Sequence, residues 1–365
     1  MVFLSACAIV KNEAQNLPRS LGSLRPYVDE LIIIDTGSTD DSILIAQQWD
    51  VIIGEFAWCD DFAAARNAAL AKATGEWILM FDADEAWHIA PDGNVNFLRD
   101  FLQQQPSDIS VCSILWRDAF IENHFHNGFY PRLLRRVPNL SYTGRLHEQP
   151  THSYGIEQGA KSQPIRRNQI TAVPPECYVL HYGYGEGKFL TKQKERYIPL
   201  MERIHAEEGL SLMLLHCLAD AYGQVEDAAG VQRCYNWVWE RISPYLLTGE
   251  KPLDIVWLPH WLYNLGIGCA DSHDFDSLRI ICQAGLAWFP EYPILHNLTG
   301  RWLAEQGFTI GAAAYFASCT RLCEAYAQGQ QIPPGNFWEP FDYTFVKQEA
   351  ENNWRYLKKL NQELN

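Results

Sequence analysis

The stretch WILMFDADE, residues 77–85, indicates the fold of the first half of the chain. Its first five residues are all large and apolar, which is typical of a strand buried on both faces, and such strands occur mostly in parallel sheets. Asp82 and Asp84, two carboxylates one residue apart, follow the strand at once. In an open α/β sheet, ligands bind beside the carboxyl ends of the strands. We therefore expect a binding site where this strand ends.

Strand and helix patterns alternate on either side of this stretch. Short apolar runs predict further strands at residues 3–10, 31–34, 51–53, 109–116 and 178–181, with several more within 129–150. Leucines at helical spacing after residue 16 and an alanine-rich segment at residues 62–73 predict helices between the early strands. Strands that alternate with helices of about 10–15 residues predict a mostly parallel α/β sheet.

From residue 187 onward the pattern is almost entirely helical. Amphipathic spacing predicts helices at residues 210–222, 228–242, 254–269, 275–289, 294–306 and 310–326. The loops at residues 272–274 and 306–307 lie about 34 residues apart, which is the tetratricopeptide period, although a similar break at Gly223 does not keep it. We expect two domains, an α/β domain at residues 1–186 and an all-α domain of degenerate, tetratricopeptide-like helical hairpins at residues 187–365.

Composition excludes several classes of protein. The net charge of −15 argues against nonspecific binding of nucleic acid. Ten cysteines stand singly, without C-x-x-C or zinc-type spacing, as is usual in a reducing compartment. The apolar first ten residues lack a basic segment and predict a strand rather than a signal peptide, and no apolar run reaches the roughly 18 residues of a membrane span. We expect a cytoplasmic protein.

Polar residues follow three of the predicted strands, at residues 11–13, at Asp35 and at Asp82 and Asp84. These groups meet at one edge of a parallel sheet. Paired carboxylates suit Mg²⁺ or Mn²⁺, which proteins commonly share with substrate phosphates. An acidic loop without a ligand is the alternative, and the strand context together with Asp35 argues against it.

Four ordered blocks carry a family resemblance: AIVKNE at residues 8–13, DTGSTDDS at 35–42, ARNAA at 65–69 and FDADE at 81–85. Their order and spacing resemble family 2 glycosyltransferases of the GT-A (Rossmann-like) fold. A weaker likeness continues through GRLHE at residues 144–148 and HYGY at 181–184. With helical hairpins following, the chain resembles the subgroup that includes bacteriocin peptide S-glycosyltransferases.

The resemblance implies a transferase that moves a sugar from a nucleotide donor, a UDP-sugar, with inversion and with a divalent metal, Mn²⁺ or Mg²⁺. It assigns the nucleotide-sugar to Asn12, Glu13, Asp35, Ser38, Arg66, Asp82 and Arg145. It assigns the metal to Asp84, with Asp82 and a late histidine, His181, as further ligands. Two alternatives remain open: Arg66 as an arginine on a helix surface, and His181 as a structural residue.

Inverting transfer needs a base that takes a proton from the acceptor. Glu148 is the first candidate, because His147-Glu148 stands where the family's acidic motif is expected, and Asp118 is the second. The sequence lacks the commoner Glu-Asp pair. If the acceptor is a thiol, the base matters less, because some thiolate exists near neutral pH.

Four arginines at positions 132, 135, 136 and 145 form a basic cluster in an acidic protein. They suit a phosphate or an acidic acceptor, or else a solvated face. The acceptor is expected to be a peptide, a glycan or a small molecule, and the helical domain to dock it or to form a homodimer. Two other functions remain: an inactive sugar-nucleotide binder joined to a protein-interaction module, and a nucleotidyltransferase. The latter ranks last, because residues 11–14 lack a glycine-rich loop.

Overall fold

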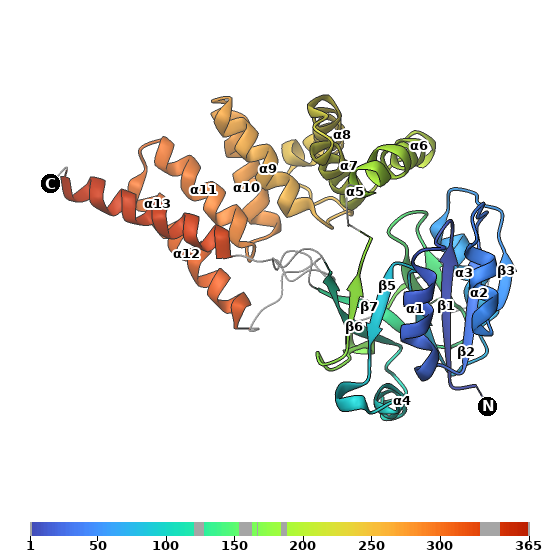
Figure 1. The fold of residues 1–365 in the computed structure, drawn as a ribbon. Helices are drawn as coiled ribbons and strands as arrows, with labels where there is room; N and C mark the ends of the chain where they lie inside the picture. The colour runs from blue at the N-terminus through green and yellow to red at the C-terminus, as the bar shows by residue number, and fades with distance from the viewer. Residues whose placement is uncertain are drawn as a thin grey trace. The chain divides into compact units, whose positions relative to one another are not determined.

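The computed structural model describes residues 2–119, 128–152, 163–165, 167–183, 188–328 and 344–363. The chain divides into two compact units, Met1–Lys192 and Gln193–Asn365, which are drawn in Figure 1. The boundary expected between residues 186 and 187 lies outside the described residues and stays a prediction.

A nine-stranded sheet forms the first unit, in the order β3-β2-β1-β4-β7-β6-β12-β5 with β11 beside β6. The strands are β1 (Leu4–Val10), β2 (Glu30–Asp35), β3 (Ile52–Glu55), β4 (Trp77–Met80), β5 (Glu85–His88), β6 (Val111–Asp118), β7 (Gly128–Arg135), β11 (Ile170–Ala172) and β12 (Tyr178–His181). Pairs among β1 to β4 are parallel, as are the pairs of β6 with β11 and β12, whereas β7 and β5 run antiparallel to their neighbours. The mostly parallel α/β sheet expected from the sequence is confirmed.

Helices cover both faces of the parallel half of this sheet, as Figure 1 shows. They are α1 (Leu17–Leu24), α2 (Ser42–Ala46), α3 (Phe62–Leu70) and, farther along, α4 (Phe97–Gln103). Alternate residues of β2 enter two separate cores: Leu31 and Ile33 pack with the leucines of α1, while Ile32 and Ile34 pack with alanines of α3. Apolar side chains on both faces explain why the strand sequences read as unbroken apolar runs.

A second, three-stranded antiparallel sheet consists of β8 (Leu140–Thr143), β9 (Gln149–His152) and β10 (Gln163–Pro164). Strand β8 packs on α3, and Asn67 holds the two together, since its side chain exchanges hydrogen bonds of 2.9 and 2.7 Å with the backbone of Tyr142. This places the loop after β8, which carries Arg145 and Glu148, beside the first turn of α3. The short helix α5 (Lys188–Lys192) ends the first unit.

The second unit is all-helical in the part that the structure describes. Its helices are α6 (Ile198–Glu208), α7 (Leu212–Gln224), α8 (Ala228–Thr248), α9 (Leu258–Asp271), α10 (Phe275–Trp288), α11 (Pro293–Glu305), α12 (Thr309–Ala327) and α13 (Thr344–Glu363). Consecutive helices pack as pairs, α7 on α8, α9 on α10 and α11 on α12. Helix α11 also packs on α9, and glycines permit close approach at two of these contacts: a Cβ on Gly266 in α9 would lie 2.5 Å from Leu298 in α11, and one on Gly300 in α11 would lie 2.6 Å from Phe316 in α12. None of the described helices is long and apolar enough to cross a membrane.

Candidate functional site

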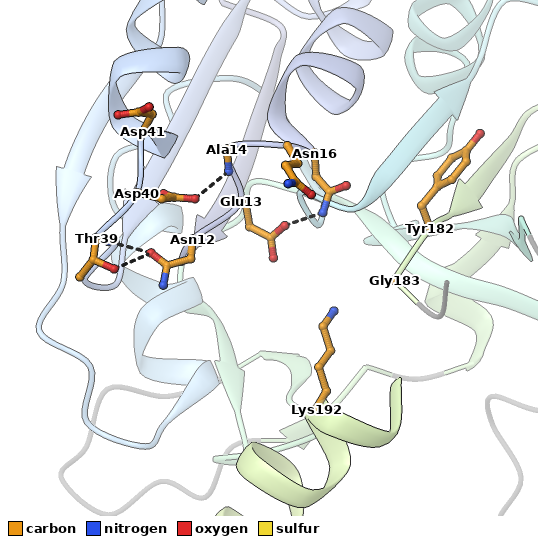
Figure 2. A pocket seen from close by; sticks show the side chains of 11 residues that line it. Asn12, Glu13, Ala14, Asn16, Thr39, Asp40, Asp41, Tyr182, Gly183 and Lys192 are labelled. Atoms are coloured by element: carbon orange, nitrogen blue, oxygen red, sulfur yellow. Dashed lines mark hydrogen bonds between the residues drawn. The ribbon is translucent and has the colours of Figure 1, made fainter. Parts of the chain in front are cut away.

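The loops after β1 and β2 are held together by hydrogen bonds between side chain and backbone. Asn12, whose φ of +57° turns the chain sharply, accepts from the Thr39 backbone at 2.7 Å through Oδ1 and donates its own N–H to Ser38 Oγ at 3.0 Å. One residue farther on, the Glu13 N–H donates to Ser42 Oγ at 2.7 Å. The two predicted strand ends therefore form one rigid rim, which Figure 2 shows from close by.

A pocket of about 740 Å³ opens beside this rim. Its lining comes from both loops, from the segment after β12 and from α5, and consists of Asn12, Glu13, Ala14, Gln15, Asn16, Thr39, Asp40, Asp41, Tyr182, Gly183 and Lys192. The pocket lies at the carboxyl ends of β1 and β2, where α/β sheets bind ligands. Two of the predicted nucleotide residues, Asn12 and Glu13, line it directly.

Two other residues predicted to bind the nucleotide, Asp35 and Ser38, shape the turn after β2. The Asp35 carboxylate accepts hydrogen bonds from the N–H groups of Gly37 at 3.3 Å and of Ser38 at 3.1 Å. Gly37 has a φ of +101°, which only glycine adopts without strain. In the structure these residues fix the rim of the pocket, and their contact with a nucleotide stays a prediction.

Asp84 and His181 lie side by side next to the pocket. His181 ends β12, which lies between β5 and β6, and its Nε2 is 3.5 Å from Asp84 Oδ2. Lys192 Nζ lies 3.4 Å from the same oxygen. Burial raises the pKa of Asp84, but its contact with His181 outweighs burial and leaves this pKa lowered. Burial likewise lowers the pKa of His181, and Asp84 reverses the effect and raises it.

The backbone at Gly183 passes close to both side chains. A Cβ at this position would lie 2.5 Å from His181 Nε2 and would also collide with Asp84 Oδ2, so only glycine fits beside the pair. The 3.5 Å between His181 Nε2 and Asp84 Oδ2 is a separation that two ligands of one divalent cation can have, because each ligand atom then lies about 2.0–2.2 Å from the ion. Among the described residues no group of three or more His, Cys, Asp or Glu side chains could hold a metal by itself. The pair nevertheless fits Mg²⁺ or Mn²⁺ shared with a substrate, because such ions take one or two protein ligands and the rest from phosphates and water.

Asp82, whose side chain is one-third exposed, belongs to a network of ion pairs with otherwise largely buried side chains, and its role as a metal ligand stays a prediction. Its Oδ1 accepts from Arg66 Nη2 at 2.9 Å and its Oδ2 from Arg132 Nη2 at 2.8 Å. Arg66 also binds Glu148 through Nε, and Arg132 binds the buried Glu85 at 2.6 Å. Burial raises the pKa of Asp82, yet Arg132 and Arg66 outweigh it and hold this pKa well below its usual range. Its predicted role as a metal ligand would require the network to open.

Glu85 is the acid in this network whose pKa is raised by burial. Its side chain has no exposed surface, and burial raises its pKa to about 7 although Arg132 opposes the shift. Its Oε2 accepts from the Asp82 N–H at 3.0 Å, so it also fixes the turn that carries both aspartates. These ion pairs and hydrogen bonds therefore hold the Asp82–Asp84 turn and Glu148 in place.

The two candidate bases differ in position. Glu148, about one-tenth exposed, lies on the loop after β8 and pairs with Arg66. Asp118, at the end of β6, has no exposed side-chain surface, and its Oδ2 lies 3.9 Å from His181 Nδ1. An acceptor can approach Glu148 more readily than Asp118, which lies behind the histidine.

The predicted basic cluster does not form one surface. Arg135 donates to the backbone of residues 105, 106 and 109, and Arg136 donates to the Gly75 carbonyl at 2.7 Å. Arg145 Nε donates to the Asp60 carbonyl at 3.2 Å and so fastens the loop before α3. The two readings of the cluster, phosphate binding and a solvated face, both missed these internal partners. The proposed contact of Arg145 with the nucleotide-sugar stays a prediction.

Three residues of the site were given no role by the sequence analysis: Lys192, Tyr182 and Glu85, although Glu85 lies in the FDADE block and Tyr182 in the HYGY block. Tyr182 lies under the Arg19 guanidinium, 3.8 Å from its ring centroid, and its N–H donates to the Asp84 carbonyl at 2.8 Å. The position of Tyr182 directly after His181 in the HYGY block was the available hint. Lys192 follows residues 184–187, which lie outside the described part, and a lysine on a five-residue helix carries no pattern that singles it out.

Comparison with known proteins supports the family resemblance of the sequence. Residues 5–159 match the family described as Glycosyl transferase family 2, which confirms the resemblance carried by the four sequence blocks. A TPR repeat-containing protein of Synechococcus elongatus is 36% identical over 193 residues, 52% of this chain and 44% of that protein. The glycosyltransferase SunS of Bacillus phage SPbeta is 30% identical over 146 residues, 39% of this chain and 33% of that protein. The chain thus spans less than half the length of these relatives.

Two solved structures are similar in part. Staphylococcus aureus TarS 1–349 is 15% identical with a TM-score of 0.35, over 91% of this chain and 95% of that one. Glucosyl-3-phosphoglycerate synthase from Mycobacterium tuberculosis, in complex with Mn²⁺, UDP and glucosyl-3-phosphoglycerate, is 21% identical with a TM-score of 0.27, over 32% of this chain and 44% of that one.

Proposed function

We propose that this chain, which carries a glycosyl transferase family 2 domain at residues 5–159, moves a sugar from a UDP-sugar to an acceptor with the help of Mn²⁺ or Mg²⁺. The observation that carries the proposal is the Asp84–His181 pair next to the pocket, whose facing oxygen and nitrogen lie 3.5 Å apart. A nucleoside diphosphate bound along the rim of Asn12 and Glu13 would reach this pair with its phosphates.

Each part of the site then has a task. Asn12 and Glu13 bind the nucleoside, with Asp35 and Ser38 behind them. Asp84 and His181 hold the metal, which when bound offsets the negative charge on the diphosphate leaving group. The network around Arg66 keeps the aspartate turn in place. The ion pairs and hydrogen bonds of the network already hold this turn before the donor binds. Binding of the donor therefore costs little conformational entropy in the turn.

Glu148 is the proposed base. The acceptor's hydroxyl or thiol attacks the anomeric carbon of the sugar, the bond to the diphosphate breaks, and the acceptor's proton passes to the Glu148 carboxylate. Arg66 orients that carboxylate. Attack from the face opposite the leaving group would invert the anomeric centre.

The helical unit is proposed to bind the acceptor, a peptide, glycan or small molecule, or to form a homodimer. Paired helices with glycines at the contacts build extended surfaces that recognise such partners. All ten cysteines are free, which fits a reducing compartment such as the cytoplasm.

Thermal unfolding with UDP, in the presence and absence of Mn²⁺, tests the donor site. A ligand that binds only the folded state raises the melting temperature by mass action. We expect UDP with Mn²⁺ to raise it and UDP alone to have a smaller effect. GDP, CDP and ADP at the same concentration report the choice of base, and a panel of UDP-hexoses and UDP-hexosamines then reports the sugar.

Asp84→Ala is the critical variant. Its matched control is Asp108→Ala, because Asp108 is an exposed turn residue that does not line the pocket. We expect the Mn²⁺-dependent shift to vanish in the first and to persist in the second. If no nucleoside diphosphate shifts the wild-type protein, the transferase proposal fails and partners of the helical unit become the subject of search.

A further inference from the structure

Lys192 is the cation that enters the pocket in this structure. It ends α5, and Figure 2 shows its side chain pointing into the space below Glu13, between the β1 loop and Gly183. Its Nζ lies 3.4 Å from Asp84 Oδ2, the oxygen that also faces His181. The side chain is about one-third exposed, whereas that of Asp84 is about one-eighth exposed.

We propose that Lys192 is an exchangeable counter-ion: its ammonium group neutralises Asp84 before the metal binds and turns to the donor diphosphate afterwards. The inference rests on the proposed function and deepens it, because it assigns the diphosphate subsite a residue from α5, outside the four sequence blocks.

The distances argue for competition at Asp84. A divalent cation between Asp84 and His181 would take the same carboxylate oxygen that Lys192 now faces. Two cations a few ångströms apart repel each other strongly, and the repulsion is less screened in a partly buried site. Metal binding therefore displaces the ammonium group.

The surrounding charges argue that Lys192 turns to the diphosphate once the metal has displaced it from Asp84. Glu13 also lines the pocket, and Asp84 and Asp82 lie close enough to interact electrostatically with its carboxyl group. These acids would repel a diphosphate unless cations offset them. The lysine stem is flexible and its head is a compact point charge, the properties with which lysine binds phosphate. A displaced Lys192 therefore meets the diphosphate at the mouth of the same pocket.

Two affinities that must move in opposite directions test the proposal. The dissociation constant of Mn²⁺ is measured without nucleotide, from the electron paramagnetic resonance signal of free Mn²⁺. That of UDP is then measured calorimetrically, with Mn²⁺ at ten times its own dissociation constant for each variant. For Lys192→Met we expect Mn²⁺ to bind about threefold more tightly, as for loss of one partly exposed competing ion pair. We expect UDP to bind about tenfold more weakly, as for loss of one charged hydrogen bond.

Lys192→Arg keeps the charge and is expected to hold both constants near wild type. Lys194→Met, the same change at an exposed lysine two residues farther on, is the matched control and is expected to change neither. A Lys192→Met protein in which both affinities fall, or neither changes, overturns the exchange. A wild-type protein that binds neither Mn²⁺ nor UDP overturns the proposed function itself, which is a different result.

Discussion

Asp118 lies behind His181, on the far side of the imidazole ring from Asp84. The Asp118 Oδ2 is 3.9 Å from Nδ1, while Asp84 Oδ2 is 3.5 Å from Nε2. The pairing of β6 with β12 sets this arrangement, since the two residues are direct partners in the parallel register. At 3.9 Å the two groups can interact as charges but are too far apart for a hydrogen bond. A carboxylate that moves in to accept the other ring N–H of a metal-binding histidine fixes the tautomer and the orientation of the ring.

We therefore expect Asp118→Asn to weaken Mn²⁺ binding about tenfold, the lower end of the range for such outer partners. The measurement is a Mn²⁺ titration followed by electron paramagnetic resonance, with circular dichroism to verify folding. Asp108→Asn, at an exposed position, is the control. If Asp118 were the catalytic base instead, turnover would fall while the Mn²⁺ affinity stayed at the wild-type value.

Gly183→Ala tests the arrangement of the two side chains that we propose to hold the metal. Its Cβ would lie 2.5 Å from His181 Nε2 and would collide with Asp84, so one of them must move. We expect Mn²⁺ affinity to fall about tenfold or more, as when ligand geometry is disturbed. Gly268→Ala in α9, where a Cβ meets nothing within 4 Å, should leave Mn²⁺ binding unchanged and stabilise its helix by up to about 1 kcal/mol. Equal Mn²⁺ affinities in the two variants would refute the role of Gly183.

Local patterns predicted most of the elements of this fold. Strand β12 falls on residues 178–181 as the apolar run indicated, and the helix predicted at 275–289 is α10 (Phe275–Trp288). Both depend on residues that are neighbours in sequence. Strand β5 (Glu85–His88) was missed, because it directly follows the acidic turn and has only four residues. No bounds were predicted for helix α13 (Thr344–Glu363), because it is polar overall and its buried face carries only a few apolar residues, among them Val346, Ala350 and Leu357.

Pairing between distant segments was beyond the sequence. His181 is a register partner of both Glu85 and Asp118, and neither alignment follows from any local period. The arginines show the same limit. Arg66 was expected near phosphates, but its partners Asp82 and Glu148, which come from separate parts of the chain, appear only once the strands are placed. The sequence predicted which residue types form the site, but it did not predict which of their charged groups pair with one another.

Arg66→Met should destabilise the first unit by about 3–5 kcal/mol, because it removes the ion-pair partner of Glu148, which is about one-tenth exposed, and one of the two arginines that pair with Asp82. The slowest-exchanging amides of β1 and β4, followed by hydrogen exchange and mass spectrometry, report this free energy of unfolding. Arg25→Met removes an exposed pair with Asp50 and should cost less than about 1 kcal/mol. A loss for Arg66→Met no larger than for this control would mean that the network adds little stability.

His260 should make the helical unit sensitive to acid. Burial lowers its pKa to about 3, and His216 adds to the effect. An unfolded histidine, with a pKa near 6.5, takes up a proton that the folded one refuses, so this stability is present above pH 6.5 and is lost as the pH falls toward 3. Between pH 7 and pH 5 the loss is about 2 kcal/mol. Hydrogen exchange of α9 amides at both pH values measures it. His260→Gln should remove this part of the loss, whereas His273→Asn, at an exposed turn residue, should retain it; equal pH dependence in both variants would contradict the assignment.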